Sequence, residues 1–83
     1  MPNKYVCTKI DKLETILIFP DYVGHDEYVR MISKHKEEIL GAGFISISDN
    51  EEHTKCYGES ISLGIKSRGV DTMLLQMHTN RKF

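Results

Sequence analysis

The chain has 83 residues, of which 40% are hydrophobic and 28% are charged, proportions that are ordinary for a globular domain. Its 11 basic and 12 acidic residues give a net charge of −1, which excludes the broad positive field of a nucleic-acid-binding protein. No apolar run approaches the roughly 20 residues that a membrane span needs. We expect one domain over residues 1–83, too small for a deep internal active site.

The N-terminal stretch and the cysteines predict the compartment. Residues 1–12 hold no apolar segment of the roughly 7 to 15 residues found in secretory signals, so we expect a cytoplasmic protein. Cys7 and Cys56 are too few for a disulfide framework. In a reducing compartment we expect both of them to be free thiols.

The first two elements are predicted to form a β-hairpin. Residues 5–10 and 13–19 are rich in β-branched and aromatic side chains, and Asp11 and Lys12 between them suit a turn. Residues 13–19 are apolar on both faces, which predicts a central strand that is paired on both sides or covered by a helix. Pro20 ends this strand because it lacks the N–H group that a sheet requires.

An amphipathic helix of about four turns is predicted from His25 or Asp26 through Leu40. Its apolar positions fall on one stripe, which consists of Tyr28, Val29, Ile32, Ile39 and Leu40. Gly43 suits the left-handed position that follows the last turn of a helix. A strand over residues 44–48 and a polar turn over residues 49–53 are expected next.

The stretch from residue 56 to residue 68 is predicted to form the long strand around which the sheet is organised. A period of two places its large hydrophobic side chains on one face and small polar residues on the other. The face expected to be buried holds Ile61, Leu63 and Ile65. A turn over residues 67–69 then leads to a last strand, which begins at Val70 or Asp71 and ends at His78.

The predicted fold class is α+β, with the elements in the order ββαβββ. A mostly antiparallel sheet of about five strands, with one helix packed on one face, is the simplest arrangement that buries all the apolar stripes.

Strand alternation also predicts a flat, hydroxyl-rich face on the side of the sheet away from the helix. This face would contain Ser46, Ser48, Ser60 and Ser62, with Tyr57 and Leu74 as apolar anchors. Such a face is either solvated or a docking surface for a second copy, a host protein or a small ligand. We expect a non-enzymatic binding protein that uses this face to bind a protein partner or itself.

Two alternatives involve other residues. Lys66, Ser67 and Arg68 form a polar turn in which a small anionic ligand could be sequestered, although an exposed hairpin turn with ordinary solubilising charge is the favoured explanation. Cys56 is the candidate nucleophile of a thiol enzyme, but no activating base is evident. The histidines are expected to be scattered on the surface and lack the spacing of a metal site, so neither a metal nor a cofactor is expected.

A sequence pattern runs through four segments: LIFP at 17–20, AGF at 42–44, CYGESISLGIKSR at 56–68 and DTMLL at 71–75. These segments resemble small proteins of bacteriophages and prophages to which no activity is assigned. The resemblance implies a cytoplasmic accessory protein made during infection. Members of that class often bind and inhibit host factors or sequester small molecules.

Overall fold

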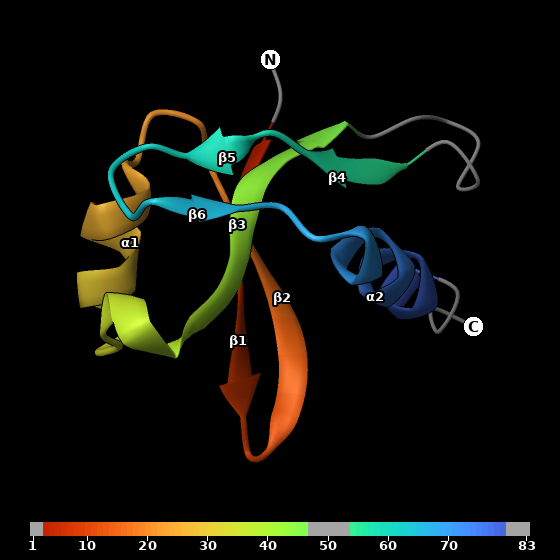
Figure 1. Cartoon of the computed structure of the whole chain (residues 1–83), viewed down its shortest axis with the longest axis horizontal. Coiled ribbons are helices and arrows are strands. Elements are labelled where there is room, and N and C mark those ends of the chain that lie inside the picture. The colour runs from red at the N-terminus through yellow and green to blue at the C-terminus, as the bar shows by residue number, and fades with distance from the viewer. Residues whose placement is uncertain (1–2, 47–53, 80–83) are drawn as a thin grey trace.

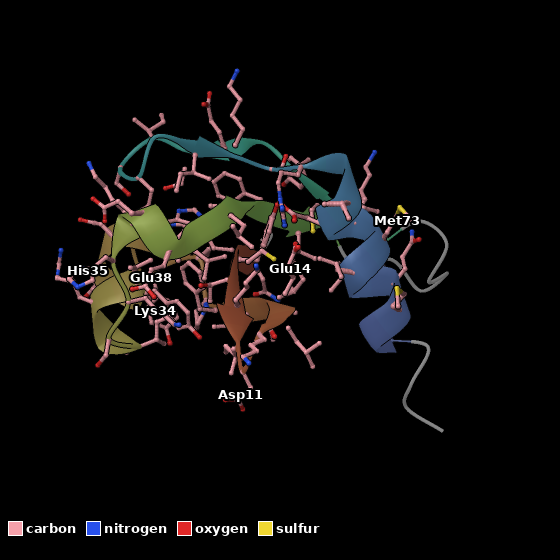
Figure 2. All side chains as sticks on the ribbon, turned by 60° about the horizontal axis from the view of Figure 1, so that its bottom comes forward. Asp11, Glu14, Lys34, His35, Glu38 and Met73 are labelled. Carbon is pink, nitrogen blue, oxygen red and sulfur yellow. The ribbon has the colours of Figure 1, made fainter. Side chains whose placement is uncertain are left out.

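An antiparallel sheet with one α-helix on each face forms the body of the protein (Figures 1 and 2). The computed structural model describes residues 3–46 and 54–79. Four strands lie in the order β2-β1-β3-β4, and each neighbouring pair is antiparallel. Their bounds are β1 Asn3–Ile10, β2 Leu13–Phe19, β3 Ile39–Ser46 and β4 Lys55–Tyr57. The predicted α+β class and the mostly antiparallel sheet are confirmed.

The predicted set of five strands and one helix is not found. Two short strands form a second sheet that lies across β3 (Figure 1), and a second helix is the last element of the described residues. The bounds are α1 His25–Met31, a 3₁₀ helix η1 Lys36–Glu38, β5 Glu59–Ser60, β6 Ile65–Lys66 and α2 Gly69–Thr79. No helix in the described ranges is both long and apolar enough to cross a membrane.

The predicted hairpin is confirmed, and its turn explains the register. Asp11 and Lys12 have φ angles of 51° and 71°, the left-handed conformations that a two-residue hairpin turn requires. The pairing therefore runs without a break from Ile10↔Leu13 at the turn to Lys4↔Phe19. Strand β2 lies at the edge of the described sheet and not at its centre as predicted. Both of its faces are apolar because α1 lies beyond one face and α2 beyond the other (Figure 2).

Helix α1 is shorter than the predicted helix, and the sequence LGAGF is not its end. The helix stops at Met31, and Ser33 adopts a left-handed φ of 58°. The residues expected in the last helical turn and its cap belong instead to β3. A Cβ atom on Gly41 would overlap the Asp71 carboxylate, and one on Gly43 would overlap the carbonyl oxygen of Tyr57. These glycines therefore allow neighbouring groups to approach the backbone of β3 closely, which is a common role of glycine within a strand.

The stretch 56–68 is not one strand. Gly58 and Gly64, with φ angles of 76° and 68°, divide it into the end of β4, the short strands β5 and β6, and a turn between them. Ile61, which was predicted to be buried, is 90% exposed in that turn, whereas Leu63 is buried as predicted. Two glycines in left-handed conformations thus override the period-two pattern, since each of them turns the chain.

The predicted last strand is helix α2. Asp71 and Leu75, four residues apart, are both buried, and Thr72 and Gln76 also lie on one flank. A helical period places these pairs together because residues four apart share a face of a helix. As a strand, this segment would have turned Met73, Leu75 and Met77 inward together; in the helix only Leu75 is buried, and both methionines are exposed.

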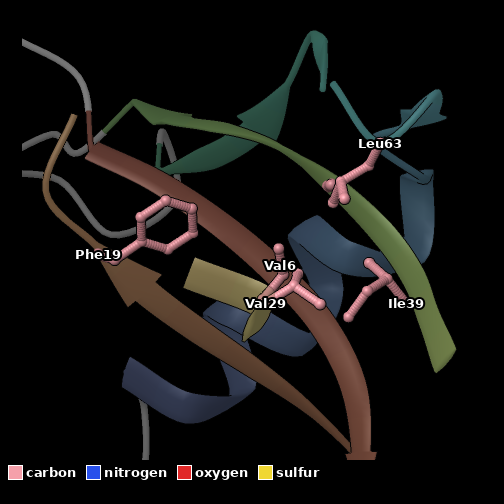
Figure 3. Packing of buried hydrophobic residues seen from close by; sticks show 6 residues of the cluster. Val6, Phe19, Val29, Ile39 and Leu63 are labelled. Carbon is pink, nitrogen blue, oxygen red and sulfur yellow. The ribbon is translucent and has the colours of Figure 1, made fainter. Parts of the chain in front are cut away.

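The two faces of the sheet carry separate hydrophobic cores. The core on the α1 side holds Val6, Phe19, Val29, Ile39, Ala42 and Leu63 (Figure 3). The core on the α2 side holds Tyr5, Cys7, Ile16, Ile45 and Leu75. Successive residues of β1 belong to different cores because side chains alternate across a strand. The sheet thus fastens each helix through its own set of side chains.

His25 joins α1 to β3 and corrects the expectation that the histidines lie on the surface. Its side chain is buried, with Nε2 2.9 Å from the carbonyl oxygen of Gly43. The ring packs edge-on against both Phe19 and Phe44. Burial lowers the pKa of His25, because desolvation disfavours the charged ring more than its backbone hydrogen bonds favour it.

This lowered pKa predicts that the protein becomes less stable in mild acid. As the pH falls below about 6.5, the unfolded chain takes up a proton before the folded chain does. Stability is therefore complete above that pH and declines below it, until the pH passes the folded-state pKa of His25. Urea unfolding between about pH 7.5 and about pH 5 measures the decline. His25→Gln is expected to reduce this loss of stability. The matched control, His35→Gln, changes an exposed histidine and should leave the loss unchanged. An unchanged loss in the His25 variant would contradict the prediction.

Candidate functional site

The predicted serine-rich face is not a single surface. Ser60, expected to be exposed, is 1% exposed in β5, where its Oγ accepts a hydrogen bond from the Leu63 N–H group at 3.2 Å. Ser62 is exposed in the following turn, and Ser46 is half-buried at the end of β3. Ser48 lies outside the described residues. The prediction fails because the continuous strand that it requires is broken at Gly58 and Gly64.

The two predicted apolar anchors lie on opposite sides of the sheet. Tyr57 pairs with Phe44 across β4 and β3, and their ring centroids are 5.8 Å apart. Leu74 lies on α2 and packs against the core on the α2 side. They do not flank a common surface.

The predicted anion-binding residues point in different directions. Lys66 is exposed at the end of β6, and the Ser67 N–H group donates a hydrogen bond to the Gly58 carbonyl oxygen at 2.9 Å. Arg68 turns inward, and its Nη2 atom lies 2.7 Å from Asp71 Oδ1 and 3.0 Å from Glu14 Oε1. Two carboxylates therefore already neutralise the guanidinium, which disfavours the anion-binding interpretation.

Asp71 is the centre of a buried polar cluster that sequence analysis missed. Its carboxylate is completely buried and accepts hydrogen bonds from the Tyr5 hydroxyl at 2.6 Å and from the Arg68 backbone N–H at 3.0 Å. The Arg68 guanidinium donates to its other oxygen through Nε and Nη2. An acidic residue in the first turn of a helix that accepts the N–H group preceding the helix is a known capping arrangement. Read as a helix start, the sequence SRGVD would have indicated the capping role of Asp71, although not its burial against Tyr5.

The hydrogen bonds of this cluster hold α2 against the sheet, and they occupy the polar side-chain groups that take part in it. Burial, followed by the hydrogen bond to Asp71, raises the pKa of Tyr5, so its hydroxyl stays protonated and serves as a donor. No buried side-chain nitrogen or oxygen in the described part of the chain lacks a hydrogen-bond partner. These contacts indicate a structural role, since catalysis needs a group that can reach a substrate.

Both cysteines are free and lie near this cluster. Burial, with a further contribution from the negative charge of Asp71, raises the pKa of Cys56 to about 11. The same two causes raise the pKa of Cys7 to about 11, although Arg68 acts in the opposite direction. The thiolate is the nucleophilic form of cysteine, so a protonated Cys56 disfavours the thiol-enzyme interpretation.

We expect both thiols to react slowly with iodoacetamide in the folded protein. At about pH 7.5, labelling should be at least tenfold slower than in the urea-unfolded chain, because the raised pKa and the burial both reduce access to thiolate. Mass spectrometry after timed labelling measures the rates, and Cys7→Ser isolates the signal of Cys56. Equal rates in the folded and unfolded chains would contradict this prediction.

An open groove of about 500 Å³ separates β2 from α2. One wall consists of residues 12–16 together with Lys9, and the other consists of Val70, Leu74 and Met77 on α2. Successive strand residues point to alternate faces, so a groove that touches residues 13–16 in a row contacts the backbone of β2 as well as the side chains on the α2 side, and it reaches Lys9, the β1 partner of Glu14. In Figure 2, Glu14 lies between the hairpin and α2, and Met73 lies on the outer side of that helix.

The groove and its surroundings expose several apolar side chains. Leu13 and Ile18 on β2 are 71% and 45% exposed, and Val70 and Met77 on α2 are 42% and 53% exposed. Val70, Leu74 and Met77 are four and three residues apart and therefore form one stripe along the helix. Leu13 points to the α1 side of β2, as Phe19 does, so we refer to Ile18, Val70, Leu74 and Met77 as the β2–α2 surface.

The free edge of β2 offers backbone hydrogen bonds beside this surface. In a two-residue hairpin, the two residues that flank the turn form backbone hydrogen bonds to each other. Beyond them, every second residue of one strand forms backbone hydrogen bonds to the opposite residue of the other strand. Thr15 and Leu17 therefore direct their N–H and C=O groups to β1, whereas Glu14, Ile16 and Ile18 direct theirs outward. Beyond β2, no strand of the described residues continues the sheet.

The described residues contain no group of three or more His, Cys, Asp or Glu side chains that is placed to hold a metal ion. The chain matches no protein-family model, no curated protein and no solved structure.

Proposed function

We propose that this protein is a non-catalytic binding protein that contacts another protein chain through the β2–α2 surface. The observation that carries the proposal is the position of an apolar groove beside a seven-residue strand, β2, that has a free edge in the described sheet. An extended segment of a partner can pair with such an edge through its main chain while its side chains fill the neighbouring groove. Of the partner-binding residues predicted from the sequence, Leu74 lies on this surface.

The chemistry of the groove favours a peptide strand over a small ligand. Its volume lies within the range of roughly 300 to 1,000 Å³ that is typical of ligand pockets. The charged residues that line the groove are Lys9, Lys12 and Glu14, and Glu14 already forms an ion pair with Arg68. Only the two lysines therefore remain to orient a small polar ligand in the groove. A small apolar molecule would not satisfy the outward backbone groups of β2, whereas a strand would.

The remaining interpretations have less support. The protonated Cys56 and the fully bonded Asp71 disfavour catalysis, and the internal ion pairs of Arg68 disfavour anion sequestration. A cytoplasmic location, an origin in a bacteriophage and a host factor as the partner stay predictions from the sequence.

Site-specific photo-crosslinking in the source cells tests the proposed surface. A photoreactive phenylalanine analogue is placed at Met77 in one variant and, as a matched control, at Ile61 in another. Both positions are exposed and apolar, but Ile61 is on the β5–β6 turn. We expect a discrete protein adduct from position 77 and none from position 61. The absence of an adduct at 77, or equal adducts at both positions, would contradict the proposed function.

A further inference from the structure

We infer that the chain bound at the β2–α2 surface is a second copy of this protein, joined by antiparallel pairing of the two β2 strands about a two-fold axis. The inference rests on the proposed function, because it names the partner for the same surface. The two four-stranded sheets would then form one continuous sheet. Because the axis is perpendicular to the sheet, both α2 helices would lie on the same side of it.

Strand β2 lacks four of the features that prevent pairing at natural sheet edges, namely lysine, proline, a bulge and a short length. It has seven residues, LETILIF, which include neither lysine nor proline, and its register with β1 is unbroken. The strand at the other edge, β4, has only three residues. The β2 edge is therefore the longer of the two edges that the described sheet offers for pairing.

The sequence of β2 is compatible with itself in an antiparallel pair. Full overlap of Leu13–Phe19 in two copies places Ile16 on the axis and Glu14 opposite Ile18 of the second copy. The backbone N–H and C=O groups that point away from β1 in one copy then meet the corresponding groups of the other copy and can bond to them. The two Glu14 positions are four residues apart along the pair, or about 13 Å. This separation exceeds the Debye length of about 8 Å at physiological salt, so the only charged residue of the strand does not oppose pairing.

The same symmetry places the two grooves next to each other. Val70, Leu74 and Met77 line the wall of the groove that faces β2. When two β2 strands join, this stripe and its symmetry equivalent both lie above the joined edges and face each other. Met77 suits such a contact because its flexible thioether adapts to an irregular space.

The exposed area fits a weak, specific dimer. Burial of the β2–α2 surface and of the strand edge would remove on the order of 500 Å² from each chain, or about 1,000 Å² in total. This total lies below the roughly 1,200 to 2,000 Å² of stable specific interfaces and within the range of weak ones, so we expect a dissociation constant on the micromolar scale.

Sedimentation equilibrium of the purified full chain, from about 1 μM to about 1 mM, tests the inference. We expect the average mass to rise from one chain toward two with increasing concentration. Ile18→Lys places a charge on the joined edge and should weaken association at least tenfold, and Leu13→Lys is a second such variant. Met31→Lys, at a position on α1 that is 67% exposed, is the matched control and should leave association unchanged. Thermal unfolding verifies that the variants fold.

A single-chain mass over the whole concentration range would overturn the inference, as would association that Ile18→Lys and Leu13→Lys leave intact. These outcomes are separate from the failure of the proposed function. If position 77 crosslinks to a different protein while the purified chain stays monomeric, the proposed function stands and the second copy is excluded.

Discussion

Replacement of Asp71 by alanine is expected to lower the free energy of unfolding by about 3 to 5 kcal/mol, the usual effect of removing one partner of a buried ion pair. The substitution leaves the Tyr5 hydroxyl without its acceptor and the Arg68 guanidinium without its buried partner. It also removes the acceptor for the N–H group that precedes α2. Because a domain of this size is stable by only about 4 to 12 kcal/mol, much of the protein's stability depends on this one carboxylate.

Urea unfolding followed by circular dichroism measures this effect. The matched control is Asp26→Ala, which removes an exposed carboxylate that forms a salt bridge with Arg30 at 3.7 Å. The control should cost no more than about 0.5 kcal/mol, the value of an exposed pair on one helix. Equal effects of the two substitutions would show that the cluster does not hold α2 on the sheet.

Replacement of Gly41 by alanine is expected to destabilise the protein by about 1 to 3 kcal/mol, the range for an added group in a well-packed interior. The new Cβ atom would overlap the Asp71 carboxylate and approach Nε of Arg68. Gly69→Ala is the matched control, because a Cβ atom there meets no other atom within 4 Å. The control should change stability by less than about 0.5 kcal/mol.

A double-mutant cycle identifies the cause of the Gly41 effect. In an Asp71→Ser background the shorter side chain makes room, so Gly41→Ala should cost much less than it does in the original chain. Additive effects would mean that Gly41 is required for a reason other than the approach of Asp71.

The part of the fold that local chemistry determines was predictable. The β1–β2 hairpin was identified because Asp11 and Lys12 suit a turn and the flanking residues favour strands. Pro20 marks the end of β2 for an equally local reason. In these segments the sequence contains the conformational preference, and the rest of the structure agrees with it.

Elements whose structure depends on distant contacts were not predictable in the same way. The residues of β3 continue an apparent helical stripe, and Gly43 resembles a helix cap, but pairing with β1 decides the outcome. In α2, the alternation of Met73, Leu75 and Met77 competes with a helical pattern in which Asp71 and Leu75 share the buried face. A buried aspartate at such a position is not expected until Tyr5 and Arg68 are known to meet it.

The candidate site was missed because it depends on strand order. Sequence reasoning treated residues 13–19 as a central strand, which has no free edge. It treated residues 70–78 as a strand, which has no stripe of residues four and three apart. The β2–α2 surface exists only because β2 lies at the edge and α2 is a helix beside it. No single segment of the sequence specifies both facts.

Pairing at the free edge of β2 is tested most directly by amide hydrogen exchange, resolved residue by residue by NMR at about 20 μM and at about 1 mM protein. We predict that the N–H groups of Ile16 and Ile18, which point outward, exchange about three to seven times more slowly at the higher concentration, because exchange of these groups then follows the fraction of monomer. The N–H groups of Thr15 and Leu17, which bond to β1, should exchange at the same rate at both. If Ile16 and Ile18 also exchange at the same rate at both concentrations, the β2 edge does not pair with a second copy.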